Sequence, residues 1–160
     1  MIKLTQFFAL FLFFFAVISC GNDDDICTTG EATPRMKIKF KTKADGKLKT
    51  MALLYVDVDY GSGPVNIISN KVNVDSILVP LRVDNNLYTN IYIRTSETGN
   101  KSVIKTNYTT KSEYVSPACG VKKLYENVNS ELITPNPVLG VEQSQNQIIN
   151  ENKTHLYLLF

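Results

Sequence analysis

The chain has 160 residues, of which 44% are hydrophobic and 20% are charged, and its formal net charge is +2. These values are typical of a globular protein with a single domain. From Arg35 onward the chain has 16 basic and 11 acidic residues, a net charge of about +5. This excess is too small to predict a nucleic-acid partner.

The chain begins with a basic residue, Lys3, and an apolar stretch from Leu4 to Ile18 that only Thr5 and Gln6 interrupt. A basic start followed by an apolar segment of about 7–15 residues is typical of a secretory signal. The stretch is too short for a membrane-spanning helix, which needs roughly 20 apolar residues.

The segment Val17–Cys20 resembles the lipobox of bacterial lipoproteins. This resemblance implies that residues 1–19 are a cleaved signal peptide and that Cys20 carries the lipid that anchors the protein to a membrane. Several acyl chains anchor a protein stably, whereas one chain holds it only marginally.

Residues 20–34 are interpreted as a lipidated acidic tether with three consecutive aspartates. The acidic run resembles the surface-export tether of Bacteroidota lipoproteins; a plain solvated spacer is the alternative. Gly21 stands where some bacteria place the aspartate that retains lipoproteins at the inner membrane. We therefore expect a lipid-anchored protein of the outer membrane that faces either the periplasm or the cell surface.

Cys27 and Cys119 remain once Cys20 is assigned to the lipid. An even pair of cysteines in an oxidising compartment predicts a disulfide bond. A metal site is not expected, because the chain has one histidine, His155, and no CxxC motif.

Residues 35–43 alternate strictly, with Met36, Ile38 and Phe40 on one face and bases on the other, which predicts a half-buried strand. An Asp-Gly pair follows and predicts a hairpin turn into a second strand at residues 51–56. That strand is apolar on both faces, as in the centre of a sheet. The register stays open, with either Thr50 or Met51 opposite Phe40.

Further strands are predicted along the rest of the chain, separated by clusters of Gly, Pro, Asn and Asp. The pattern predicts an all-β fold over residues 35–160, either an antiparallel β-sandwich or a small barrel-like domain. Residues 134–152 are predicted to be a long loop that contains a short helical turn. The remaining predicted strands are Val65–Ile68, Ser76–Val83, Leu87–Thr95, Ser102–Tyr108, Glu113–Ser116, Lys122–Asn127 and Thr154–Phe160.

Three stretches carry a family resemblance: "ICTTGEATPRMKIKF" near the start, "SPACG" at residues 116–120 and the closing "THLYLLF". They are similar to a family of Bacteroidota outer-membrane lipoproteins of unknown function. The resemblance implies an all-β lipoprotein domain and supplies no activity.

Catalytic chemistry has few candidates in this sequence. There is no G-x-S-x-G elbow, and a serine or cysteine nucleophile would have only His155 as its base. Asp57 and Asp59 share a strand face and suggest either a carboxylate pair or a calcium ligand set. We favour two solvated aspartates at a strand end, and we predict no catalytic residue, metal or cofactor.

The main predicted surface feature is a row of basic residues on the first strand, which we call the basic stripe. It has two interpretations. It could bind a polyanion, such as lipid phosphates, an anionic glycan or an acidic partner. Alternatively, its lysines protect an edge strand against pairing with other chains, which we favour. The stripe consists of Arg35, Lys37, Lys39, Lys41 and Lys43.

Two functions are consistent with these features. The first is a non-catalytic docking or structural module that binds an outer-membrane protein. The second is a surface lipoprotein that binds a glycan or small ligand on some of its eight tyrosines. Tyrosines that line a concave face would favour ligand binding, and a flat face would favour docking.

Overall fold

The computed structural model describes residues 32–117 and 119–160, and these residues form strands, turns and loops with no helix among them. The predicted all-β fold class is confirmed. The predicted signal peptide, Cys20 and Cys27 lie outside the described residues. In the described part of the chain, no helix is long and apolar enough to cross a bilayer. The strands are β1 (Met36–Lys41), β2 (Met51–Asp59), β3 (Pro64–Val74), β4 (Ser76–Val79), β5 (Tyr88–Arg94), β6 (Ser102–Ser116), β7 (Gly120–Thr134), β8 (Gly140–Gln143) and β9 (Leu156–Leu159).

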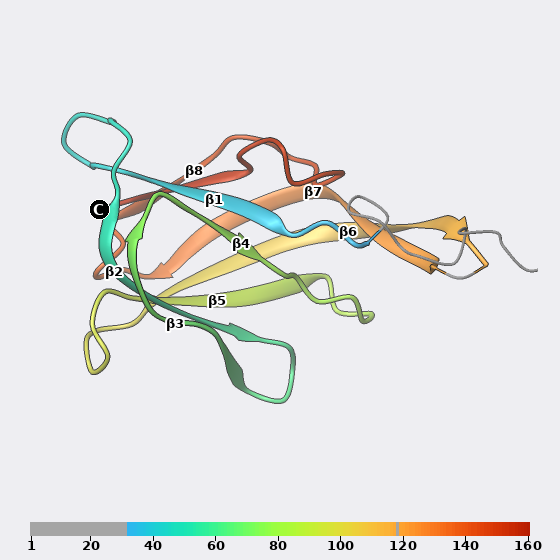
Figure 1. Ribbon diagram of the computed structural model, residues 1–160, viewed down its shortest axis with the longest axis horizontal. Helices are drawn as coiled ribbons and strands as arrows, with labels where there is room; N and C mark the ends of the chain where they lie inside the picture. The colour runs from blue at the N-terminus through green and yellow to red at the C-terminus, as the bar shows by residue number, and fades with distance from the viewer. Residues whose placement is uncertain (1–31, 118) are drawn as a thin grey trace, which may run out of the picture.

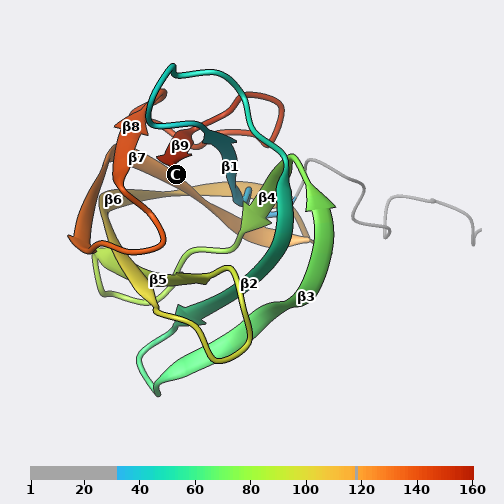
Figure 2. The ribbon, with the colours of Figure 1, turned by 90° about the vertical axis from the view of Figure 1, so that its left-hand side faces the viewer.

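The described strands form two sheets that pack face to face as a sandwich (Figures 1 and 2). One sheet has the order β4-β1-β9-β8, and the other has the order β3-β2-β5-β6-β7. β1 and β9 run parallel, although they lie near opposite ends of the sequence, and the other neighbours are antiparallel. The last strand therefore lies inside the four-stranded sheet and closes the domain.

The hydrophobic core lies between the two sheets. As predicted, Met36, Ile38 and Phe40 project from β1 into the core, where they are fully buried. Burial of each such side chain contributes roughly 1.5–3 kcal/mol. Buried side chains from the five-stranded sheet complete the core, among them Leu54, Val56, Val58, Ile91, Ile93 and Ile104.

The predicted hairpin between the first two strands is wrong, because β1 and β2 lie in different sheets. The turn itself forms at Gly46, whose φ of 68° suits glycine. Pairing across the turn ends soon after a bridge between Lys41 and Leu48, and the carbonyl of Phe40 accepts the N–H of Lys49 at 2.9 Å. Neither predicted register is correct, and the chain then crosses to the other sheet.

The longest strands, β6 and β7, form a hairpin that extends beyond the sandwich (Figure 1). β5 pairs with β6 only from Ser102 to Asn107, whereas the pairing of β6 with β7 continues to Ser116. Two predicted strands, Ser102–Tyr108 and Glu113–Ser116, are thus parts of one element.

The predicted loop over residues 134–152 contains a strand, β8, at the edge of the four-stranded sheet. No helical turn occurs in this segment, which the structure describes in full. Farther along, Ile148 bonds back to Tyr125 of β7 through N–H···O distances of 2.8 and 3.2 Å. This contact ties the loop to the five-stranded sheet.

Candidate functional site

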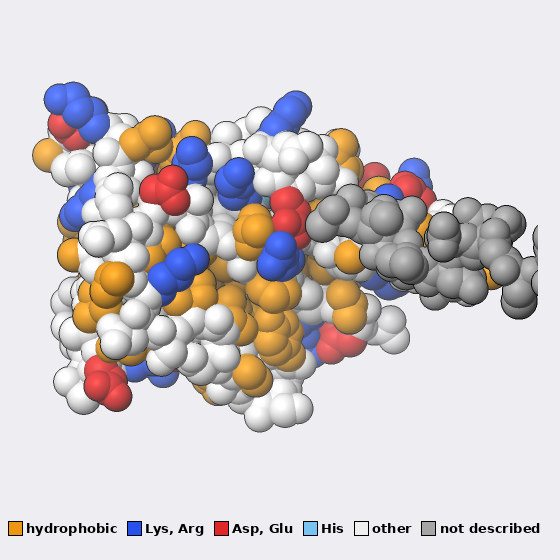
Figure 3. Space-filling view, viewed as in Figure 1, with side chains coloured by type: hydrophobic (Ala, Val, Ile, Leu, Met, Phe, Trp, Pro, Cys, Tyr) orange, Lys and Arg blue, Asp and Glu red, His pale blue; other side chains and the backbone are white. Residues whose placement is uncertain are grey.

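The predicted basic residues lie on or beside β1, and we call their surface the basic face. Because Met36, Ile38 and Phe40 point into the core, the alternating Lys37 and Lys39 point outward and are half-buried. Figure 3 shows Lys and Arg side chains spread over the part of the molecule where β1 and β4 lie, with acidic side chains among them. The basic face comprises Arg35, Lys37, Lys39, Lys41 and Lys43.

The prediction that these lysines protect an edge strand is wrong. β1 is hydrogen-bonded to β4 on one side and to β9 on the other. Lys37 stands opposite Leu78 of β4, and Lys39 stands opposite Ser76 of β4 and Tyr157 of β9. Lys37, Lys39 and Lys41 therefore lie on an interior strand of the sheet, and Arg35 and Lys43 flank that strand.

Two acidic residues partly neutralise the basic face. Glu151 binds Arg35 through both carboxylate oxygens, at 2.7 and 2.8 Å from the guanidinium nitrogens. This contact lowers the pKa of Glu151 and raises that of Arg35. Glu142 lies 2.6 Å from Nζ of Lys41, which also sits 4.1 Å from the ring centre of Tyr157. Five bases and two acids leave this face at about +3.

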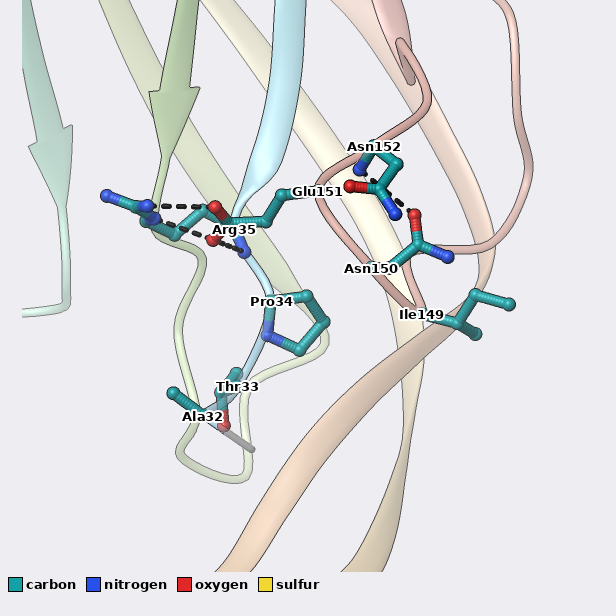
Figure 4. Close-up of a pocket in the computed structure, with 8 residues that line it drawn as sticks. All are labelled: Ala32, Thr33, Pro34, Arg35, Ile149, Asn150, Glu151 and Asn152. Atoms are coloured by element: carbon teal, nitrogen blue, oxygen red, sulfur yellow. Dashed lines mark hydrogen bonds and ion pairs between the residues drawn. The ribbon is translucent and has the colours of Figure 1, made fainter. Parts of the chain in front are cut away.

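A cleft of about 480 Å³ lies at one end of the basic face (Figure 4). Its polar groups largely bond to one another: Arg35 pairs with Glu151, and the N–H of Asn152 donates to Oδ1 of Asn150 at 3.0 Å. Such a cleft offers few free polar groups to a ligand. It is lined by Ala32, Thr33, Pro34, Arg35, Ile149, Asn150, Glu151 and Asn152.

His155 lies close to this cleft but is buried, with 2% of its surface exposed. Its ring Nδ1 accepts the backbone N–H of Lys37 at 2.8 Å. The backbone N–H of His155 in turn donates to the carbonyl of Lys37 at 2.9 Å. Burial lowers the pKa of His155, and the nearby Lys37 charge lowers it further, while a backbone hydrogen bond with Asn150 and the charge of Glu151 oppose the shift. A ring nitrogen that accepts a hydrogen bond carries no proton, so the imidazole is neutral in this arrangement, and it holds β1 to the start of β9.

The two candidate carboxylates, Asp57 and Asp59, have separate structural partners. Asp57 is buried, and its oxygens accept hydrogen bonds from Arg94 at 3.0 Å and Asn66 at 2.7 Å. The prediction of a solvated side chain is therefore wrong for Asp57. Asp59 accepts the N–H of Gly61 at 2.7 Å and shapes the turn after β2.

Metal ligation has no support among residues 32–117 and 119–160. No group of three or more His, Cys, Asp and Glu side chains in these ranges could hold an ion.

A second surface, which the sequence did not locate, lies on the outer face of the five-stranded sheet. Tyr88 and Tyr92 alternate outward on β5. Nζ of Lys105 lies 4.7 Å from the ring centre of Tyr88, and Nζ of Lys101 lies 5.1 Å from that of Tyr92. Alternation along β5 already puts both tyrosines on one face of the strand, and the pairing of β5 with β6 then brings Lys105 beside them. Neither tyrosine lines the cleft beside the basic face.

Cys119 lies in the turn of the β6–β7 hairpin, where its N–H donates to Oγ of Ser116 at 3.1 Å. Its expected partner, Cys27, lies outside the described residues. The disulfide bond therefore stays a prediction.

Comparison with known proteins places the chain in a family without assigning an activity. A family model described as a family of unknown function, DUF6452, matches residues 58–160, which is more than half of the chain. The chain belongs to this family. No curated protein and no solved structure matches the chain significantly. DUF6452 membership agrees with the predicted resemblance to a family of unknown function.

The DUF6452 match begins inside β2 and leaves β1 outside. Yet β1 lies between β4 and β9, so the matched segment needs it to complete the four-stranded sheet. The basic face is consequently built from both parts of the chain, with its bases before residue 58 and Glu142 and Glu151 within the match.

Proposed function

We propose that this protein is a lipid-anchored, non-catalytic docking module of the outer membrane, and that it binds an acidic surface of a membrane protein through the basic face. The central place of β1 carries the proposal. Lysines on an edge strand are explained by protection against aggregation, whereas lysines in the middle of a sheet face have no such role. The positive charge of the basic face would complement the negative charge of an acidic partner surface.

The shape of the basic face supports docking over ligand capture. Lys37 and Lys39 extend from neighbouring positions of a sheet surface, with Leu78 and Tyr157 beside them. Long basic side chains that cover apolar surface present both charge and hydrocarbon to a partner. The adjacent cleft has its carboxylate committed to Arg35, which leaves little for the orientation of a small molecule.

The candidate catalytic groups support a non-catalytic role. His155 is neutral and bonded to the backbone on β1, Asp57 is paired with Arg94, and Asp59 holds a turn. A general base must reach a substrate proton, whereas His155 is buried and its Nδ1 is occupied by the backbone N–H of Lys37.

The lipid anchor is supported by the lipobox-like segment at Val17–Cys20. A Cys20→Ser variant is expected to lose membrane fractionation and incorporation of labelled fatty acid. Unchanged partition of this variant into detergent would contradict the anchor.

The docking face is tested by charge removal in intact cells. A photo-reactive amino acid at Leu78, which lies beside Lys37, should yield a defined adduct with an outer-membrane protein. We expect the adduct to fall several-fold in Lys37→Gln/Lys39→Gln. It should stay unchanged in Lys71→Gln/Lys101→Gln, which removes the same charge from exposed positions on β3 and just before β6, two strands of the opposite sheet. Equal yields from the two double variants would contradict docking through this face.

The second candidate function, glycan binding, is favoured by Tyr88 and Tyr92 beside Lys105 and Lys101. Aromatic rings with neighbouring polar groups are typical of saccharide contacts. Binding of an anionic polysaccharide that Tyr88→Ala/Tyr92→Ala abolishes, and that Lys37→Gln/Lys39→Gln leaves intact, would favour this function over docking.

A further inference from the structure

The far end of the β6–β7 hairpin is an uncharged, partly apolar projection, and we call its described residues, 114–117 and 119–121, the hairpin tip. Beyond Asn107, β6 continues for nine residues, 108–116, without pairing to β5. At about 3.3 Å per residue, these residues extend roughly 30 Å. Within the tip, Tyr114 and Val121 stand directly opposite each other and are 65% and 58% exposed.

Basic residues flank the hairpin tip on the side of the sandwich. Lys111 is exposed, Lys123 donates to Oγ of Ser112 at 2.9 Å, and Lys122 lies 2.9 Å from Glu113. Three bases and one acid leave this collar at +2. An exposed tyrosine and valine below a basic collar match the water–lipid interface, where aromatic rings sit at the level of the headgroups.

The N-terminal segment leads to the same end of the molecule. The N–H of Lys123 donates to Oγ1 of Thr33 at 2.9 Å, so the start of the described chain runs beside the hairpin. Figure 1 shows the hairpin at one end of the sandwich and the C-terminus at the other. From Cys20 to Ala32 there are 32 − 20 = 12 residue steps. The lipid-bearing cysteine can therefore lie at most about 40 Å from Ala32.

These observations orient the domain on its membrane. We propose that the hairpin tip inserts into the headgroup region of the bilayer that holds the lipid anchor, with Tyr114 and Val121 in contact with lipid and the basic collar at anionic headgroups. The inference rests on the proposed anchor at Cys20. Apolar contact and attraction of bases to anionic lipid act together at such sites.

A bilayer contact at the tip would also turn the basic face to the side. β1 runs along the sandwich, with the hairpin projecting beyond one end (Figure 1). Lys37 and Lys39 would then point sideways, along the plane of the membrane, toward a neighbouring membrane protein. The predicted bond between Cys27 and Cys119 would shorten the path from lipid to tip to 27 − 20 = 7 residue steps.

The test measures the depth of the tip in reconstituted vesicles. The lipidated protein is placed in vesicles of phosphatidylethanolamine and phosphatidylglycerol that contain nitroxide-labelled lipid. An environment-sensitive fluorescent amino acid replaces either Tyr114 or Leu48. Leu48 is a matched control, because it is also 65% exposed but lies in the loop between β1 and β2, away from the hairpin.

We expect quenching at position 114 to exceed quenching at position 48 several-fold, and Val121→Ser together with Lys111→Gln to reduce that difference. Equal quenching at the two positions in anchored protein would overturn the inference and leave the anchor intact. Protein that does not stay on the vesicles at all would overturn the anchor, and the inference with it. Unfolding in urea checks that each variant is folded.

Discussion

Removal of the Asp57 carboxylate is expected to destabilise the domain strongly, although the residue carries no catalytic role. Its Oδ2 accepts Nη2 of Arg94 at 3.0 Å, and its Oδ1 accepts Nδ2 of Asn66 at 2.7 Å. The Arg94 guanidinium also lies over the ring of Tyr55, at 5.3 Å from its centre. Asp57→Ala leaves this guanidinium largely buried without its counter-charge.

The size of the effect follows from the burial of the pair. The side chains of Asp57 and Arg94 are only 10% and 18% exposed. Loss of one partner of a buried pair costs about 3–5 kcal/mol. Because some solvent reaches both side chains, we expect about 2–4 kcal/mol for Asp57→Ala. Nε of Arg94 lacks a hydrogen-bond partner among the described residues, and after the loss of Asp57 the guanidinium keeps the uncharged carbonyl of Glu97, to which its Nη1 donates.

Urea unfolding at pH 7 measures this cost through the midpoint and the slope. The double variant Asp57→Ala/Arg94→Ala should lose less than the sum of the single variants, with a coupling of roughly 0.5–3 kcal/mol. Asp75→Ala is the control, because Asp75 is exposed, and it should change stability by no more than about 0.5 kcal/mol. Additive losses, or an Asp57 effect as small as that of Asp75, would refute the reasoning.

Three further predictions concern the core, the pH dependence and the disulfide bond. Phe40→Ala should cost about 3–5 kcal/mol in urea unfolding, because Phe40 is fully buried and packs edge-to-face on Phe160 at 5.9 Å; a loss below about 1 kcal/mol would contradict its place in the core. The free energy of unfolding should fall as the pH drops below about 6.5, because His155 takes up a proton in the unfolded chain but resists protonation when it is buried. His155→Gln should make the free energy of unfolding depend less on pH between about pH 6.5 and 5. An equal pH dependence in both proteins would count against buried His155 as its source. Mass spectrometry of unreduced protein from the envelope should find peptides of Cys27 and Cys119 joined, and two free thiols would exclude the bond.

Period-two alternation predicted the interior of the fold well, because burial on one sheet face requires it. Met36, Ile38 and Phe40 are buried as expected. The turn at Gly46 also forms, but a local turn does not determine which sheet the next strand joins. Four-residue β8 was missed, because its apolar content is low and its pairing with β9 depends on a distant part of the chain.

The residues of the candidate site were predictable from the sequence, but the position of their strand within the sheet was not. The sequence placed Lys37 and Lys39 on one face of a strand, which the structure confirms. Whether that strand is an edge or a centre depends on the parallel pairing of β1 with β9, which joins segments more than 100 residues apart. The partnership of Asp57 with Arg94 likewise arises from the register of β2 and β5.

Site-specific photo-crosslinking in intact cells tests the docking proposal most directly. A photo-reactive amino acid is placed at Leu78, which lies beside Lys37 on the basic face, or at Tyr92, on the outer face of the opposite sheet. We expect one dominant outer-membrane protein adduct from position 78, none from position 92, and loss of the first adduct when Lys37→Gln/Lys39→Gln is added. An adduct from position 92 with none from position 78 would contradict docking through the basic face.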